Sequence, residues 1–258
     1  MRIVSLACSN TEIVCALGRE KDLVGVDDHS DFPAEIVCRL PRVGPDLEID
    51  VERVAELKPD LVLATLTVPG HERVVEKLQR AGLPFLAPEP TSLQDVYASI
   101  REIGEHLDAS READVVIAEM TRAADQRVTS ATDGDQPLSV LVQWWPKPVI
   151  APGRLSWTHD LIIEAGLINP LGDEDVKSRP LTDEEVRAMD PDAIVLSWCG
   201  IAAEKYRPEV IYSNPLWQSV TAVQQRRVVS IPEAFLGRPS PRLIEGLKAL
   251  RRIGKEAG

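Results

Sequence analysis

Apolar residues at helical spacing mark one long, uninterrupted helix at residues 110–131. They form a single stripe made of Ala113, Val116, Ile117, Met120, Ala124, Val128 and Ala131. Ser110 is a suitable N-terminal cap, and the segment contains neither Gly nor Pro. Because a helix of about twenty residues is roughly 30 Å long, this segment predicts a rod that carries the chain from one lobe to another.

Two copies of one local pattern flank the long helix. Residues 50–64 and 182–196 each predict a short capped helix, a Pro-Asp stop and a buried strand. Residues 12–18 and 160–166 each predict a short helix closed by Gly. The helix, Pro-Asp and strand pattern is common in α/β proteins generally. However, the two pairs of copies occur in the same order, which favours two related lobes.

Strands alternate with helices along the whole chain, and this alternation predicts mainly parallel sheets. We therefore expect an α/β fold with an N-terminal lobe at residues 1–109, a connecting helix at 110–132 and a C-terminal lobe at 133–258. Ligands of such sheets bind beyond the carboxyl ends of the strands. The segments predicted to leave those ends are residues 7–9, 27–32 and 65–68 in the first lobe, and 144–145, 198–200 and 233–238 in the second.

The composition predicts a globular protein and excludes several kinds of partner. The 258 residues are 44% hydrophobic, which is enough for a core, and no apolar run is long enough to span a bilayer. The net charge of −12 argues against nucleic acid and against anionic membrane surfaces. The first residues lead directly into a strand without the features of a signal peptide, and the four cysteines show no CxxC spacing, so the sequence as written favours a cytoplasmic location.

Motifs of catalysis and of cofactor binding are missing from the sequence. There is no GxGxxG, GxxxxGK[ST], GxSxG or HExxH pattern, so we expect no catalytic residue and no intrinsic cofactor. His29, with Asp28 and Asp31, offers imidazole and carboxylate groups suited to a divalent ion. A single histidine in a polar loop is more typical of a solvated turn, and we therefore predict no resident metal.

The few aromatic residues concentrate where strands of the second lobe end. Aromatic residues make up only 4% of the chain, yet four of them follow predicted strands, namely Trp144, Trp145, Trp198 and Phe235. They could close the end of the second sheet, or they could form a flat apolar wall for a large planar ligand. Arg238 and Arg154 are near enough in sequence to meet carboxylate, amide or phosphate groups on the rim of such a ligand.

Several short motifs together resemble one known family. The chain resembles the cobalamin-type binding proteins of ATP-binding-cassette (ABC) importers, part of a wider group of siderophore, haem and metal receptors with a helical backbone. The resemblance covers nearly the whole chain. It rests on residues 5–12 (SLACSNTE), 17–18 (LG), 24–26 (VGV), 30–33 (SDFP), 57–62 (LKPDLV) and 240–242 (SPR).

The resemblance implies two α/β lobes on one rigid helix, with a ligand held between them and only slight closure on binding. The ligand contacts that it implies, together with the aromatic residues above, are Cys8, Ser9, His29, Phe32, Thr65, Leu66, Trp144, Trp145, Trp198, Phe235 and Arg238. The chain departs from the family at two positions. His29 replaces a tyrosine, and Thr65 or Leu66 replaces a tryptophan. His29 could instead face a cobalt or iron centre.

By the same resemblance, the protein is a non-catalytic, monomeric carrier that delivers a corrinoid, cobalamin or cobinamide, to an ABC permease. Glu72 and Glu204, or Glu209 in place of the latter, would meet arginines of the permease, and the location would be periplasmic or at the cell envelope. A siderophore or haem carrier is an alternative, which Arg and Tyr clusters around an anionic ligand would favour. A cytoplasmic corrinoid-handling protein or an enzyme on this scaffold is another, which the missing export signal favours.

Overall fold

The structure is a computed structural model that describes residues 1–125 and 136–255. The chain divides into two compact units. Unit 1 comprises Met1–Pro90 and Gln94–Glu119, and unit 2 comprises Thr91–Leu93 and Met120–Gly258. The main sheet of each unit is parallel, so the predicted α/β class with mainly parallel sheets is confirmed. None of the described helices is both long and apolar enough to cross a membrane.

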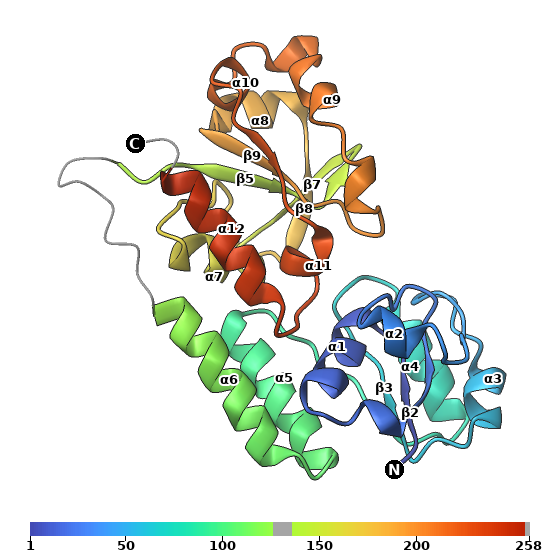
Figure 1. The fold of residues 1–258 in the computed structure, drawn as a ribbon. Coiled ribbons are helices and arrows are strands. Elements are labelled where there is room, and N and C mark those ends of the chain that lie inside the picture. The colour runs from blue at the N-terminus through green and yellow to red at the C-terminus, as the bar shows by residue number, and fades with distance from the viewer. Residues whose placement is uncertain (126–135, 256–258) are drawn as a thin grey trace. The chain divides into compact units, whose positions relative to one another are not determined.

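Unit 1 is built on a four-stranded parallel sheet with the order β2-β1-β3-β4 (Figure 1). The central strands are entirely buried, as their runs of apolar residues predict for a sheet covered on both faces. Ile3 pairs with Leu61, and Ser5 pairs with Leu63. The four strands are β1 (Ile3–Ser5), β2 (Leu23–Val26), β3 (Leu61–Leu63) and β4 (Phe85–Leu86).

The helices of unit 1 follow the predicted order. Asp50 caps one of them by accepting a hydrogen bond from the backbone N–H of Arg53 at 3.0 Å, as the first copy of the repeated pattern predicts. These elements are α1 (Cys8–Ala16), η1 (Glu20–Asp22), α2 (Ala34–Val37), α3 (Val51–Glu56), α4 (His71–Arg80), α5 (Leu93–His106) and α6 (Ser110–Asp125).

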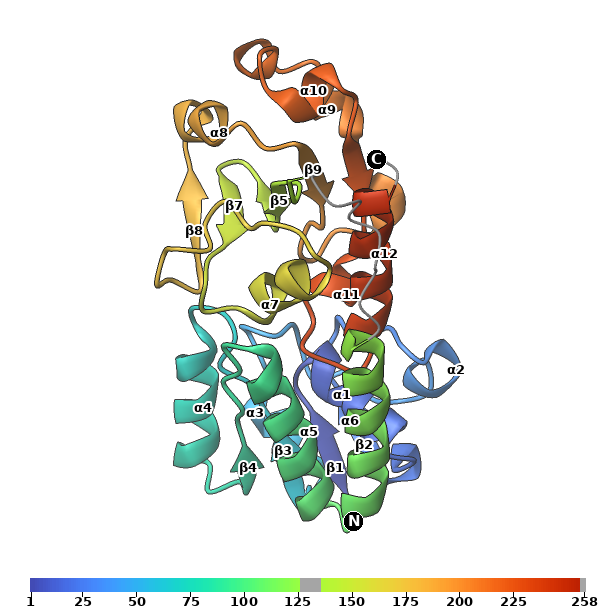
Figure 2. The ribbon, with the colours of Figure 1, turned by 90° about the vertical axis from the view of Figure 1, so that its left-hand side faces the viewer.

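The long helix predicted at residues 110–131 is present as α6 over its described part, and the rest of that range lies outside the described residues. Helix α6 lies beside α5 (Figure 2). A Cβ added at Gly104 would lie 2.7 Å from the Cβ of Ala113, so the two helices pack closely because residue 104 has no side chain. The boundary between the units falls within α6, after Glu119.

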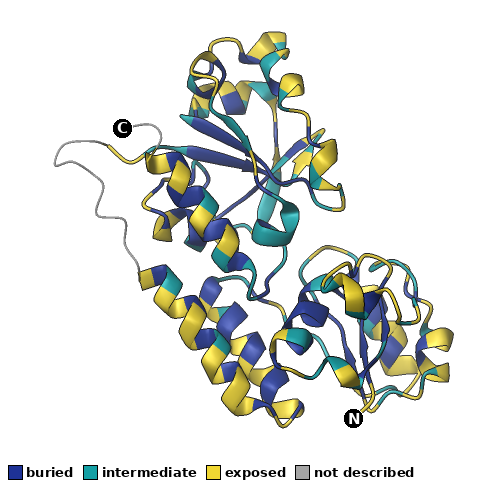
Figure 3. Ribbon diagram, viewed as in Figure 1, coloured by how far each residue is buried: buried dark blue, intermediate teal, exposed yellow. Residues whose placement is uncertain are grey.

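Unit 2 combines a parallel and an antiparallel sheet. The parallel sheet has the order β10-β9-β5, and its strands are dark blue in the burial view of Figure 3 apart from the half-buried β10. The antiparallel sheet, β6-β7-β8, was not predicted from the sequence. The strands are β5 (Val140–Gln143), β6 (Trp145–Pro146), β7 (Val149–Pro152), β8 (Ser178–Leu181), β9 (Ala193–Leu196) and β10 (Val228–Ser230).

The helices of unit 2 are mostly short. Thr182 and Glu185 form the expected capping box at the start of one of them, with both reciprocal hydrogen bonds present. The elements are α7 (Trp157–Glu164), α8 (Asp183–Met189), η2 (Ala203–Lys205), α9 (Pro208–Tyr212), η3 (Pro215–Trp217), α10 (Thr221–Gln224), α11 (Glu233–Leu236) and α12 (Leu243–Lys255).

Within unit 2, two charged side chains bind the backbone of those residues of α5 and α6 that belong to this unit. Asp160 accepts a hydrogen bond from the backbone N–H of Leu93, the first residue of α5, at 2.6 Å. The guanidinium of Arg251 donates to the carbonyls of Ala123 and Ala124 near the end of α6, at 2.6 Å each. The carboxylate of Asp160 therefore lies at the N-terminus of α5, and the guanidinium of Arg251 lies near the end of α6. Both charges are placed favourably for the helix dipole.

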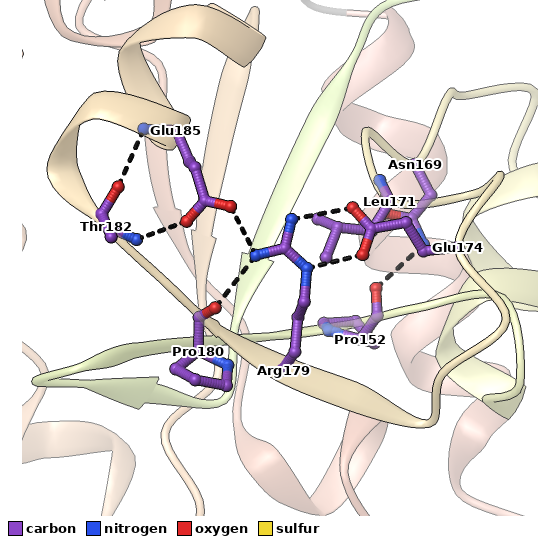
Figure 4. Close-up of polar contacts among 8 residues, drawn as sticks. All are labelled: Pro152, Asn169, Leu171, Glu174, Arg179, Pro180, Thr182 and Glu185. Carbon is purple, nitrogen blue, oxygen red and sulfur yellow. Dashed lines mark hydrogen bonds and ion pairs between the residues drawn. The ribbon is translucent and has the colours of Figure 1, made fainter.

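A charged cluster joins the antiparallel sheet of unit 2 to α8 (Figure 4). Arg179 of β8 makes two hydrogen bonds to Glu174, at 2.5 and 2.8 Å, and a third to Glu185 at 2.7 Å. Glu185 is also the capping residue of α8, so one guanidinium connects the sheet to the helix. These contacts hold the pKa of both carboxyl groups below the usual range and raise the pKa of Arg179.

We expect Arg179→Ala to lower the melting temperature by about 2–4 °C, the shift that ~1 kcal/mol produces in a protein of this size. Because the pKa of Glu174 is below its ordinary value of 4.5 in the folded protein, the contribution is complete above that pH and is lost as the pH falls through the folded pKa. Thermal melts at neutral and acidic pH test this. Arg187→Ala, at an exposed site on α8, is the control, and an equal effect of both variants would contradict the prediction.

Candidate functional site

The residues predicted to bind a ligand lie at the carboxyl ends of the parallel strands in each unit. In unit 1 they follow β1, β2 and β3, and in unit 2 they follow β5, β9 and β10. We describe these two groups separately as the unit 1 edge, made of residues 7–9, 27–32, 44–47 and 65–71, and the unit 2 edge, made of residues 143–145, 197–199 and 233–242.

A chain of buried hydroxyl and carboxyl groups organises the unit 1 edge. The hydroxyl of Thr11, which is fully buried, lies 2.8 Å from the hydroxyls of both Ser5 and Ser30. Ser30 donates in turn to Asp27 at 2.5 Å. Burial raises the pKa of Asp27, and the guanidinium of Arg42 donates to the carbonyls of Asp27 and Ser30, at 2.7 Å each. These contacts fix the loop that carries His29.

This polar chain replaces the capping box that the sequence pattern at residues 9–12 suggests. Helix α1 begins at Cys8, one residue earlier than a Ser9 cap would allow, and its N-cap Ala7 makes no side-chain hydrogen bond. Thr11 is turned toward the sheet instead. Ser9 is therefore the second residue of α1 and not its N-cap, so the capping box that the pattern of residues 9–12 suggests is not formed.

Two imidazoles face one carboxylate at the unit 1 edge. Nε2 of His29 lies 3.7 Å from Oδ1 of Asp46, and Nε2 of His71 lies 3.7 Å from Oδ2. Nδ1 of the buried His71 accepts a hydrogen bond from the backbone N–H of Val68 at 3.3 Å, which leaves Nε2 on the side of the carboxylate. The neighbouring imidazoles, His71 first, hold the pKa of Asp46 below its usual range.

The other predicted residues of unit 1 differ in exposure. Phe32 is 43% exposed, whereas Ser9 and Thr65 are buried, and Thr65 lies 3.4 Å from the carbonyl of Pro88. Cys8 and Leu66 are half-buried. In the part of the chain that the structure describes, no three His, Cys, Asp or Glu side chains are placed to hold a metal ion.

Aromatic side chains dominate the unit 2 edge. Trp144 stacks on Trp157 with ring centroids 6.1 Å apart, and the indole of Trp157 donates to the carbonyl of Leu236 at 2.8 Å. Trp145 is 40% exposed. Trp144 itself is half-buried. The indole of Trp145 donates to the carbonyl of Lys147 at 3.1 Å, so this exposed ring is held by its own hairpin.

Trp198 belongs to the core of unit 2. It is 5% exposed and lies 5.3 Å from the ring of Tyr206. The hydroxyl of Tyr206 donates to the carbonyl of Trp198 and accepts from the backbone N–H of Glu233, each at 3.1 Å. Burial raises the pKa of Tyr206 to about 12, so this hydroxyl keeps its proton and joins β9 to α11. Trp198 thus closes the end of the sheet.

Charged groups of unit 2 are paired beside Phe235. The guanidinium of Arg238 lies 3.0 Å from the carboxylate of Glu233, and that of Arg242 lies 4.9 Å from the centre of the Phe235 ring. A Cβ at Gly246 would overlap with the carbonyl oxygen of Phe235, so α12 packs directly on α11 and fixes this ring. Arg154 is paired with Asp175.

The two glutamates assigned to permease contact are both exposed. Glu72 lies at the start of α4 and accepts a hydrogen bond from the backbone N–H of Gly70 at 2.7 Å, so it also caps its own helix. Glu204 lies in η2 of unit 2. Glu209, in the first turn of α9, is exposed as well.

Several residues of the two edges were not predicted from the sequence. Asp46 and His71 of unit 1 and Trp157 and Tyr206 of unit 2 lie outside the segments predicted to leave the strand ends. Glu233 lies inside the predicted segment 233–238 but was not named as a candidate. Asp46 carries no local signal, because it lies in a turn that follows Gly44 and Pro45.

Comparisons with known proteins agree with this arrangement. A family model described as periplasmic binding protein matches residues 3–235. The chain is 31% identical to an uncharacterized ABC transporter substrate-binding lipoprotein, YvrC, of Bacillus subtilis, over 96% of this chain and 78% of that one. It is 28% identical to the vitamin B12-binding protein of Vibrio cholerae, over 96% and 86%. The structure of the periplasmic heme-binding protein RhuT from Roseiflexus, 27% identical, superposes with a TM-score of 0.82 over 99% and 98%.

We expect Thr11→Val to lower the free energy of unfolding by about 1–3 kcal/mol, because it leaves buried hydroxyl groups of Ser5 and Ser30 short of a partner. Thr11→Ser keeps the hydroxyl and is the matched control, with a smaller loss. Chemical denaturation followed by circular dichroism measures both. Equal losses for the two variants would show that the methyl group of Thr11, and not its hydroxyl, is what stabilises the unit 1 edge.

Proposed function

This chain belongs to the periplasmic binding protein family, and we propose that it binds a corrinoid, either cobalamin or cobinamide. Membership makes it a non-catalytic substrate-binding protein of an ABC importer. The relatives bind different ligands, vitamin B12 in one case and haem in another. The choice among these ligands therefore depends on the residues at the two edges of this chain.

The aromatic surface of unit 2 is the observation that carries the corrinoid proposal. Trp145 is 40% exposed in β6, directly after the carboxyl end of β5, and the preceding residue, Trp144, stacks on Trp157. An indole can cover a large planar ring at a small cost in conformational entropy. The match of nearly the whole chain to a vitamin B12-binding protein supports the same ligand class.

A second candidate is haem, and His29 is the observation that favours it. Its side chain is 50% exposed, and its ring lies on the loop that follows β2. Neutral imidazole is a good ligand for iron and cobalt. Under this proposal, His29 would contact the central metal of the bound compound, and Phe32 on the same loop would contact its ring.

The remaining assignments complete the proposal. We propose that Cys8, Ser9, Thr65 and Leu66 line the unit 1 edge near the ligand. In unit 2, Phe235, Arg238 and the buried Trp198 would support it, with Trp145 as the principal contact. Glu72 and Glu204, one exposed in each unit, would contact the permease. We further propose a monomer with lobes at residues 1–109 and 133–258 and a connecting helix at 110–132.

Titration with cyanocobalamin, cobinamide, haemin and a ferric siderophore tests the ligand class. We expect the corrinoids to quench tryptophan fluorescence with saturation, and we expect Trp145→Ala to weaken that binding by about tenfold, or ~1.4 kcal/mol. Leu216→Ala removes a comparably exposed apolar side chain of unit 2 and should leave affinity unchanged. Binding of the siderophore alone would contradict the proposal, as would equal effects of the two variants.

His29→Ala distinguishes contact with the metal from contact with the ring. If the imidazole binds the central metal, the variant shifts the visible absorption bands of bound haem or cobinamide and weakens binding. His106→Ala, which changes an exposed histidine on α5, is the control. Unchanged spectra and affinities for His29→Ala would rule out direct contact with the metal.

A further inference from the structure

We infer that Asp46 selects the class of ligand at the unit 1 edge, favouring a planar compound with an uncharged amide rim over one with a carboxylate rim. The inference rests on the proposed function and makes it more specific. Corrinoids carry carboxamide groups around the ring, whereas haem carries two propionates. A carboxylate on the protein can accept hydrogen bonds from the former and repels the latter.

Backbone contacts hold Asp46 at the carboxyl end of the sheet. The N–H of Asp28 donates to the carbonyl of Gly44 at 2.9 Å, and the N–H of Gly44 donates to the Asp28 carboxylate at 3.2 Å. Leu47, next to Asp46, packs on the start of α4, where a Cβ at Gly70 would lie 3.2 Å from it. The turn is thus fixed against the loops that follow both β2 and β3.

The charge of Asp46 is available to a ligand. Its side chain is 39% exposed. Within the described residues, the charged or chargeable groups within 4 Å of its carboxylate are the imidazoles of His29 and His71. The Nδ1 atom of His71 is occupied by the backbone N–H of Val68, so this imidazole faces the carboxylate only through Nε2. No lysine or arginine in the described part of the chain pairs with Asp46, and the carboxylate therefore keeps most of its negative charge.

Exposed apolar side chains lie on the loops that meet at the unit 1 edge. Phe32, Leu47 and Val68, on the loops that also carry His29, Asp46 and His71, are 43%, 44% and 42% exposed. Exposed apolar side chains on the same edge as one charged group suit a ligand that has an apolar face and a polar rim.

The test compares dissociation constants of cyanocobalamin and haemin for the wild type and for Asp46→Asn. Removing the charge while keeping the shape should tighten haemin binding by about tenfold, as expected for one partly exposed like-charge contact, and change cyanocobalamin binding less than threefold. Glu56→Gln, at an exposed site on α3, removes the same charge elsewhere in unit 1 and should change neither constant. An unchanged ratio for Asp46→Asn, or an equal shift for Glu56→Gln, overturns the inference.

Two further readouts separate the possible failures. Haemin binding to the wild type should tighten as salt rises from about 0.05 to 0.5 M, because screening weakens repulsion. Asp46→Asn should show a weaker dependence, whereas Glu56→Gln, with the same net charge, should show that of the wild type. If haemin binding to the wild type does not depend on salt, the role of Asp46 is overturned. This result does not require the variant to fold. If the wild type binds cyanocobalamin but its haemin binding does not depend on salt, the role of Asp46 is overturned and the proposed function stands. If the wild type binds neither cyanocobalamin nor haemin, both the proposed function and the role of Asp46 are overturned.

Discussion

A buried hydroxyl must find its hydrogen bonds inside the protein, and the unit 1 edge is arranged around that requirement at Thr11. Its oxygen lies within 2.8 Å of two other buried hydroxyls, which lead to the carboxylate of Asp27. An unpaired group at this depth would cost about 1–3 kcal/mol. The polar chain therefore determines where α1 begins and how the loop after β2 leaves the sheet, and so where His29 and Phe32 lie.

The parallel sheet then brings distant segments to this loop. Because β1, β2 and β3 run in the same direction, all their following loops emerge at one edge. The turn that carries Asp46 joins them through its backbone bonds to Asp28. A carboxylate and two imidazoles thus meet at one edge, together with the loops that carry three exposed apolar side chains, although His29 and His71 are 42 positions apart in sequence.

The sequence was sufficient wherever local rules decide the structure. The caps at Asp50 and Thr182 and the burial of β3 and β9 follow from propensity and apolar pattern. The antiparallel sheet was not predictable, because Trp145 and Pro146 form a strand only through pairing with Val149 and Ile150. The burial of Trp198 was not predictable for the same reason, because its ring packs against that of Tyr206, a contact between different segments of the chain. Asp46 was missed because its role arises only from contacts between loops.

The two edges differ in how many of their buried polar groups lack a hydrogen-bond partner. In unit 1 the buried hydroxyls of Ser5, Thr11 and Ser30 are hydrogen-bonded, and Nε2 of His71 is buried without a hydrogen-bond partner among the described residues. In unit 2, among the described residues, the amide of Gln143, the hydroxyl of Ser197 and the indole N–H groups of Trp144 and Trp198 are buried without a hydrogen-bond partner. All four lie where β5 and β9 end. Each buried polar group without a hydrogen-bond partner lowers the stability of the folded protein. Several such groups at one edge are therefore expected where residues serve ligand binding as well as packing.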